Sequence, residues 1–212
     1  AFVSGVPFWE PGAKEREVIY HNSIFSAGQG SGIYHKQALV PFGEYVPLEG
    51  LIRGLVPFFD LPLSSFTAGT ADQAPLKAKG YLLAPYICYE IVYPELVRKL
   101  GKQSDVLITI SNDAWFGHSL GPLQHFEMAR MRALEMGRYL IRDTNTGITA
   151  IVDAQGNVVN ELPRFEQGVL SGVVYRTVGS TPFADWGYWP LLVVCGVLVL
   201  GSFLVSLRRK AI

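Results

Sequence analysis

The strongest constraint on the fold of this chain is a long uncharged segment close to its C-terminus. Residues 191–207 read LLVVCGVLVLGSFLVSL, which is seventeen positions without a charged side chain, and residues 188–190 extend the run to twenty. A helix rises about 1.5 Å per residue, so twenty residues span about 30 Å, the thickness of the hydrocarbon layer of a bilayer. Aromatic residues flank one end and basic residues the other: Trp186, Tyr188 and Trp189 before, and Arg208, Arg209 and Lys210 after. Such flanks are typical of a transmembrane helix whose basic end is cytoplasmic.

This segment divides the chain into four expected parts. We predict a domain over residues 1–180, an interfacial aromatic linker over 181–190, a transmembrane helix over 191–207 and a basic cytoplasmic tail over 208–212. The domain then lies on the side of the membrane opposite the tail. The alternative is a helix buried in a protein core, which the lack of a polar face and the two flanks argue against.

Composition agrees with a membrane component, since 49% of the residues are hydrophobic and only 17% are charged. The formal net charge is zero, so no excess of charge favours a nucleic acid partner. The two cysteines, Cys88 and Cys195, lie in dissimilar contexts, and we expect no disulfide between them. The first residues, AFVSGVPFWEPG, lack both a Met and a signal-peptide pattern. We therefore expect this chain to be the C-terminal part of a longer protein.

Strand-like and helix-like stretches alternate before the uncharged segment. Strands, some with turns, are predicted at 1–12, 15–28, 80–90, 104–112, 139–145 and 168–179, and residues 30–47 predict a short strand followed by a loop rich in Pro and Gly. Residues 147–162 predict a hairpin that turns near Gly156. Helices are predicted at 94–102 and 122–138, and Pro94 suits the first position of a helix. This order predicts an α/β layered fold with an at least partly parallel sheet.

Cys88 ends an apolar strand in the stretch ICYEIVYPEL, residues 87–96. Free cysteines are among the most commonly buried residues, so residue type alone favours a structural role. The context favours a nucleophile, because N–H groups and the dipole at a helix start stabilise a thiolate. A strand followed by a nucleophile, a turn and a helix also directs backbone N–H groups at a developing oxyanion.

A nucleophilic cysteine needs a base or a cation beside it. None of the four histidines, His21, His35, His118 and His125, lies in a Cys/His motif or at metal-ligand spacing, so we expect structural or surface roles for them. The stretch YHKQALVPFGEYVP supplies a lysine instead. The loop after Lys36 can bring Glu44 back toward it, and such a pair would hold the ammonium charged and oriented near a thiolate.

Three motifs in order, YHKQALVPFGEYVP, ICYEIVYPEL and ISNDAWFG, resemble the Glu–Lys–Cys enzymes of the nitrilase superfamily. Together with the uncharged helix and the basic tail, the residues of these motifs are most similar to the membrane-bound branch of the superfamily, the apolipoprotein N-acyltransferases. This resemblance covers almost the whole chain. It implies an α/β fold, the nitrilase-like αββα sandwich, incomplete at the N-terminus and followed by one transmembrane helix. It implies no cofactor and no metal.

The resemblance also implies a reaction and roles for named residues. Cys88 would form a thioester with an acyl chain from a phospholipid donor, and the chain would pass to the amino group of an apolipoprotein acceptor. Lys36 would support the oxyanion, Glu44 would position the lysine and the nucleophile, and Tyr89 and Glu90 would be oxyanion or neighbouring site residues. The domain would be periplasmic on the bacterial inner membrane, and the upstream transmembrane part of the same protein would be a further partner.

One element of the family pattern is missing. The family's general-base glutamate precedes the lysine by more residues than this chain contains, and Glu10 in PFWEPG is too close to Lys36 and sits in an expected turn. We therefore expect the base upstream of this chain, and we expect residues 1–212 to be inactive alone.

Three further segments allow two interpretations each. Residues 48–66 are apolar but broken by prolines, and they form either an irregular packed segment or a lid that admits a lipid. In the loop 111–117, three residues line the acceptor pocket or shape an Asx turn: Asn112, Asp113 and Trp115. Residues 142–147, RDTNTG, border the site or only turn the chain.

Two other functions stay open on the sequence. A membrane-tethered amidase or nitrilase would use the same residues and let water take the acyl group. A non-catalytic membrane-bound interaction domain would use none of them, and the joint presence of Lys36, Glu44 and Cys88 argues against it.

Overall fold

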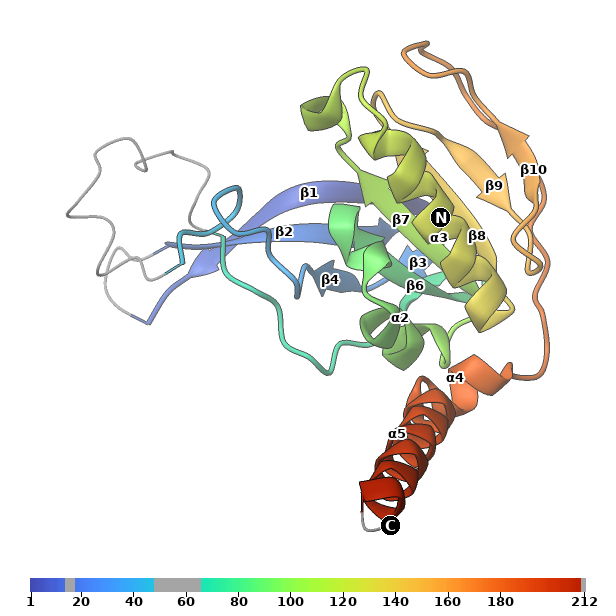
Figure 1. Cartoon of the computed structure of the whole chain (residues 1–212). Helices are drawn as coiled ribbons and strands as arrows, with labels where there is room; N and C mark the ends of the chain where they lie inside the picture. Colours follow the sequence, from blue (N-terminus) through green and yellow to red (C-terminus); the bar gives the residue numbers. More distant parts are fainter. Residues whose placement is uncertain (14–17, 48–65, 211–212) are drawn as a thin grey trace.

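The computed structural model describes residues 1–13, 18–47 and 66–210. Their body is built of layers (Figure 1), and a single long helix projects from it. Residues 48–65 of the predicted lid lie outside the described residues. The other predicted elements can be compared with the structure one by one.

A three-stranded antiparallel sheet in the order β1-β2-β4 forms one layer. It contains β1 (Phe2–Pro11), β2 (Val18–Ala27) and β4 (Ile33–His35). β1 and β2 pair along their whole length, from Phe2 opposite Ala27 to Pro11 opposite Val18. The strands predicted at the start of the chain are therefore confirmed, and β1 carries Glu10 inside a strand rather than in a turn.

A seven-stranded mixed sheet in the order β10-β9-β8-β7-β6-β5-β3 forms the second layer. Its centre is parallel and consists of β6 (Tyr81–Ile87), β7 (Val106–Ser111) and β8 (Tyr139–Thr144). Antiparallel strands complete it: β3 (Gly30–Ser31), β5 (Leu76–Ala78), β9 (Ala150–Val152) and β10 (Val158–Glu161). The central strands are nearly continuous apolar runs because both of their faces are covered.

Helices α2 (Pro94–Gly101) and α3 (Gly121–Met136) cover one face of the large sheet. A Cβ at Gly101 would lie 3.2 Å from the side chains of Leu107 on β7 and Met136 on α3, so these elements approach closely at this point. The opposite face of the sheet meets β1, where a Cβ at Gly5 would lie 3.6 Å from Ile110. The described residues thus form helix, sheet and sheet, which are three of the four layers predicted.

Residues 168–179 do not form the predicted last strand. This segment runs without ladder hydrogen bonds, and the side chains of Val169 and Val178 are about nine-tenths exposed. Its contact with β10 is a side-chain one, from Asn160 Nδ2 to the carbonyl of Ser171 at 3.1 Å. The valines gave the segment strand propensity, but propensity forms no strand where the neighbouring edge does not pair with it.

One short helix of the structure was not predicted. Within the predicted linker 181–190, α4 (Pro182–Trp186) forms a single helical turn, and Thr181 caps it by accepting a hydrogen bond from the N–H of Ala184. An ion pair of 3.1 Å between Lys102, directly after α2, and Asp185 ties α4 to the body. Five residues are too few to show a helical period in a sequence.

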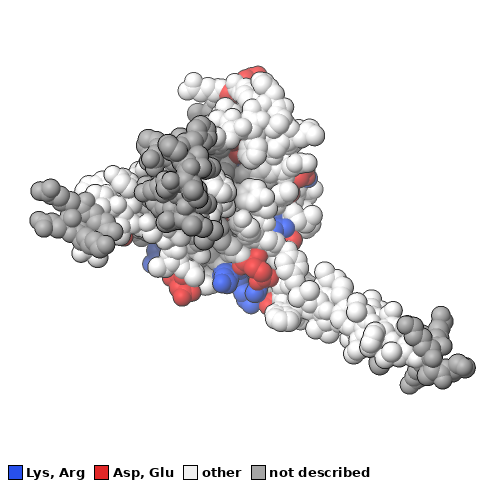
Figure 2. All heavy atoms as spheres, turned by 60° about the vertical axis from the view of Figure 1, so that its left-hand side comes forward, with Lys and Arg blue, Asp and Glu red and all other residues white. Residues whose placement is uncertain are grey.

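The long helix α5 (Trp189–Lys210) follows at the predicted place. Figure 2 shows it standing away from the body, with a surface almost free of charge over its described part. Its apolar side chains between Leu191 and Leu200 are exposed. Within the part of the chain that the structure describes, no helix meets the combined requirement of length and apolarity for crossing a membrane.

Candidate active site

The candidate site lies where the three central parallel strands end. Ile87 pairs with Ile110 across β6 and β7, and Ser111 pairs with Thr144 across β7 and β8. The loops that follow these strands therefore start side by side at one edge of the sheet. In open α/β sheets this edge is where ligands usually bind.

Cys88 is the first residue after β6, and its backbone is left-handed with φ +53°. It begins the 3-10 helix η2 (Cys88–Val92), whereas α2 begins only at Pro94. The expected support from a helix dipole is therefore that of one short turn. A left-handed residue other than glycine is strained and persists only where its surroundings hold it. Cys88 is partly exposed.

Lys36 and Glu44 form the predicted pair. Lys36 follows β4, its side chain is 1% exposed, and its Nζ lies 2.6 Å from Glu44 Oε2. The Glu44 carboxylate also accepts hydrogen bonds from the N–H of Val40 at 2.8 Å and from Asn22 Nδ2 at 2.9 Å. A buried ammonium needs such a partner to stay charged, so this loop keeps Lys36 both charged and oriented.

Glu90 joins the lysine loop to the cysteine turn. Its side chain is fully buried. Oε1 accepts hydrogen bonds from the N–H groups of Gln37 at 2.7 Å and Ala38 at 3.1 Å, directly after the lysine. Oε2 accepts one from the N–H of Ile87 at 2.8 Å, directly before Cys88. The carboxylate is therefore placed between backbone groups, as a positioning residue rather than one that faces a substrate.

Burial raises the pKa of Glu90 above its ordinary value, although hydrogen bonds from three backbone N–H groups and from the Tyr34 hydroxyl oppose this shift. Its neighbour Tyr89 is different, since the ring is 40% exposed and lies edge-on to Tyr93, with 5.7 Å between ring centroids. The predicted oxyanion contact through the N–H of Tyr89 stays a prediction.

The three candidate residues in the loop after β7 differ in their contacts and exposure. Asn112 Oδ1 accepts hydrogen bonds from the N–H of Ala114 at 3.1 Å and from Asn145 Nδ2 at 2.6 Å, which fits the Asx-turn interpretation. Trp115 lies in the short 3-10 helix η3 (Ala114–Phe116) and is 84% exposed. Asn112 is exposed as well, so a substrate could reach either Trp115 or Asn112.

Asp113 is fully buried. Its carboxylate accepts hydrogen bonds from the hydroxyl of Ser111 at 2.6 Å and from Arg142 Nη2 at 2.8 Å, and it lies 3.2 Å from His125 Nδ1. Burial alone would raise the pKa of Asp113, but hydrogen bonds from His125 and Ser111 and the charge of Arg142 lower it overall.

His125 is the residue of the site that the sequence did not assign. It lies 3% exposed in α3, and its Nε2 is 3.1 Å from the carbonyl oxygen of Cys88. A usable signal was present, because His125 shares the buried face of its helix with Ala129 and Ala133, four and eight residues on. A polar residue in an apolar helical stripe needs a buried partner.

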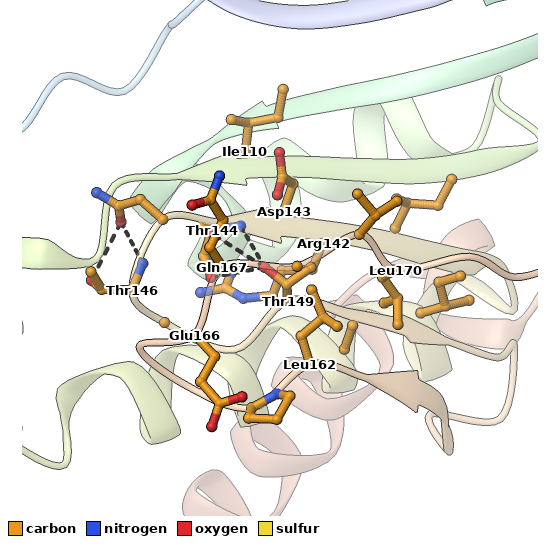
Figure 3. Close-up of a pocket in the computed structure, with 18 of the residues that line it drawn as sticks. Ile110, Arg142, Asp143, Thr144, Thr146, Thr149, Leu162, Glu166, Gln167 and Leu170 are labelled. Carbon is orange, nitrogen blue, oxygen red and sulfur yellow. Dashed lines mark hydrogen bonds between the residues drawn. The ribbon is translucent and has the colours of Figure 1, made fainter.

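Residues 142–147 border a cavity of about 660 Å³ that is also lined by β9 and by residues 162–170 (Figure 3). Ile110 and Thr144 are among the side chains drawn around it. Cys88, Lys36 and Glu44 are not among its lining residues, so this cavity is separate from the thiol. Among the described residues, no three His, Cys, Asp or Glu side chains are placed to hold a metal ion.

Residues 1–183 match the family model described as carbon-nitrogen hydrolase. The chain belongs to the carbon-nitrogen hydrolase family. The fold agrees, since solved structures are similar: a carbon-nitrogen hydrolase from Helicobacter pylori G27 (TM-score 0.54, 20% identity, 78% of this chain and 59% of that one) and an amidase from Nesterenkonia sp. (TM-score 0.51, 20% identity, 78% and 57%). The predicted nitrilase-like α/β fold is therefore confirmed.

Curated relatives are more similar in sequence. The apolipoprotein N-acyltransferase of Pseudomonas syringae pv. tomato is 54% identical over 98% of this chain and 41% of its own length. That of Shewanella oneidensis is 51% identical over 85% of this chain and 35% of its own length. The resemblance read from the three motifs is confirmed. The chain spans about two-fifths of the length of the first of these relatives.

Proposed function

We propose that this chain carries the nucleophile of an N-acyltransferase that moves a fatty acyl group from a membrane phospholipid to the amino group of diacylglyceryl-cysteine in apolipoproteins. The observation that carries the proposal is the link made by Glu90, which hydrogen-bonds both the loop after Lys36 and the turn of Cys88. Glu90 thereby joins the loop of the buried Lys36, which is paired with Glu44, to the left-handed turn that carries Cys88. The shared name of the curated relatives supports the choice of donor and acceptor.

In the first step the Cys88 thiolate attacks the ester carbonyl of the phospholipid and a carbon–sulfur bond forms. The Lys36 ammonium and the N–H of Tyr89 stabilise the oxyanion that develops. The carbon–oxygen bond of the ester then breaks, and the leaving alcohol takes the proton that a base removed from the thiol. The products are an acyl thioester on Cys88 and a lysophospholipid. We assign the base to a glutamate of the full-length protein outside residues 1–212.

In the second step the amino group of the acceptor attacks the thioester. The same base takes a proton from the nitrogen, the carbon–sulfur bond breaks, and Cys88 leaves as the thiolate. The thioester has to survive between the steps, so water must be kept from it. Exposed apolar side chains of the nucleophile turn and of the segment after β7 suit a lipid chain: Tyr89, Tyr93, Trp115 and Leu120.

We also propose that the chain is placed at the bacterial inner membrane. Residues 1–180 would be the periplasmic catalytic part, 181–190 an interfacial linker, 191–207 the membrane helix and 208–212 a cytoplasmic tail. The exposed apolar side chains of α5 support this, as do Trp186 and Trp189 at its start, which are also exposed. The orientation is tested by fusing reporter domains after Ile212. A reporter that works only in the cytoplasm should be active there, and activity of a reporter that works only in the periplasm would contradict the orientation.

The reaction is tested by the intact mass of the full-length protein purified with phospholipid. We expect a fatty acyl adduct on Cys88 that is absent in Cys88→Ala, retained in the matched control Cys195→Ala and discharged by a diacylglyceryl-cysteine peptide. An adduct lost to water as fast as to the peptide would indicate an amidase-type hydrolase instead. A protein that never forms the adduct would indicate a non-catalytic interaction domain.

A further inference from the structure

A second buried polar network lies on the helical side of the Cys88 turn, apart from Lys36, Glu44 and Glu90. It contains Ser111 and Asp113 from the end of β7, Arg142 from β8 and His125 from α3, and all four side chains are less than a tenth exposed. Burying an acid, a cation and an imidazole together is costly unless each finds partners. We therefore expect these four residues to hold a neighbouring part of the site in place.

The hydrogen bonds of the network hold the His125 ring in place. Its Nδ1 lies 3.2 Å from Asp113 Oδ1 and 3.1 Å from Arg142 Nη2, and Arg142 Nη2 donates to Asp113 Oδ2 at 2.8 Å. The hydroxyl of Ser111 also donates to Asp113 Oδ1, at 2.6 Å. The other ring nitrogen, Nε2, is 3.1 Å from the carbonyl oxygen of Cys88. Because a carbonyl oxygen only accepts, Nε2 carries a hydrogen and donates it to this oxygen.

The Cys88 turn is then held from both sides. Glu90 Oε2 binds the N–H of Ile87, in the residue before the nucleophile, and His125 binds the carbonyl of the nucleophile itself. A left-handed backbone at a cysteine is not its preferred state, and the direction of the thiol depends on that backbone. A donor fixed by a buried ion pair is suited to keep the peptide after Cys88 in place.

We propose that His125 is a positioning residue for the nucleophile, oriented by Asp113 and Arg142, and that its Nε2–H bond to the Cys88 carbonyl keeps the thiol aimed for attack. This inference rests on the proposed function only in taking Cys88 as the nucleophile. The Nε2 of His125 is directed at the backbone of Cys88, so the ring acts on the reaction through the position of the nucleophile.

Two amide substitutions separate the donor to Cys88 from the rest of the network. In His125→Gln the side-chain nitrogen can occupy the place of Nε2 and still donate to the carbonyl of Cys88. In His125→Asn the shorter side chain reaches only the place of Nδ1, so the contact with Asp113 and Arg142 is kept and the donor to Cys88 is lost. Both replacements are uncharged amides, so the two variants are matched in polarity.

The readouts are the rate of thioester formation in a single turnover and the rate of Cys88 alkylation by iodoacetamide, followed on the Cys88 peptide by mass spectrometry in the full-length protein. We expect His125→Asn to lower both rates, thioester formation by about 100-fold, because a displacement of the order of 1 Å costs that much. His125→Gln should restore most of either rate. Thermal unfolding should shift by similar amounts in the two variants. A purely structural role of His125 would produce the same shifts, so the two rates decide the inference.

Equal rates in the two folded variants, or wild-type rates in His125→Asn, would overturn the inference. If His125→Asn does not fold, Ser111→Ala loosens Asp113 more gently, and unchanged alkylation of Cys88 in that variant would overturn it as well. The proposed function fails separately, because a wild-type protein that forms no thioester would refute the reaction while the alkylation rates still report on the position of the thiol.

Discussion

Replacing Glu90 with glutamine should weaken the fold and the reaction together, because this one carboxylate ties two loops. Oε1 accepts three hydrogen bonds, from the N–H groups of Gln37 and Ala38 and from the hydroxyl of Tyr34, and Oε2 accepts one from the N–H of Ile87. The amide oxygen of a glutamine can keep the first three. Its NH2 group then faces the N–H of Ile87, and one buried donor loses its acceptor.

An unsatisfied buried donor costs about 1–3 kcal/mol. For a domain of about 200 residues each kcal/mol lowers the unfolding temperature by roughly 2–4 °C. Glu90→Gln should therefore unfold a few degrees below the wild type. Glu90→Ala removes all four acceptors and leaves a cavity, so it should cost more than about 4 kcal/mol.

The assay pairs thermal unfolding of the full-length protein with the rate of thioester formation on Cys88. Glu95→Gln is the matched control, because Glu95 is half-exposed and pairs with Arg98 at 2.8 Å on the surface of α2. An exposed pair of this kind contributes less than about 1 kcal/mol. The reasoning about Glu90 is refuted if Glu90→Gln unfolds and reacts like Glu95→Gln.

Three further predictions follow from single contacts. Lys36→Ala should lower thioester formation by about 100- to 1,000-fold, as loss of an oxyanion donor does, while the protein stays folded enough for Cys88 to be alkylated. The pKa of Asp113 is lowered, so its contribution to stability is complete above the ordinary carboxyl range and is lost as pH falls through the lowered value. Asp113→Asn should flatten the acid side of a stability–pH curve, and a curve parallel to that of the wild type would contradict this. Gly101→Ala should cost about 1–3 kcal/mol, because the new Cβ meets side chains of β7 and α3 at 3.2 Å, and an unchanged unfolding temperature would show that these side chains can move.

The strands and helices that could be predicted are those whose pattern is local. The buried strand ending at Ile87 and the helix starting at Pro94 depend on apolar runs, a proline and a glycine, which sequence alone displays. Residues 168–179 show the limit of this reasoning. Their valines have strand propensity, but whether they pair depends on the edge of β10, which no local pattern describes.

The site could be predicted in part for the same reason. Lys36 and Glu44 are eight residues apart in one loop, so their pairing could be expected from a proline and a glycine between them. His125 meets Arg142 only because α3 packs against β8, and it meets Cys88 only because α3 packs against η2. Contacts between elements far apart in the chain carry no spacing that a single sequence reveals.

The pKa values of the two fully buried carboxylates of the site are shifted in opposite directions. Burial would raise the pKa of Asp113, but hydrogen bonds from His125 and Ser111 and the charge of Arg142 lower it. The described partners of Glu90 are neutral donors, and burial raises its pKa although these donors oppose the shift. The two carboxylates therefore hold the site in different ways. Asp113 acts through a charged pair with Arg142, whereas Glu90 acts through hydrogen bonds from the two loops that meet at Cys88.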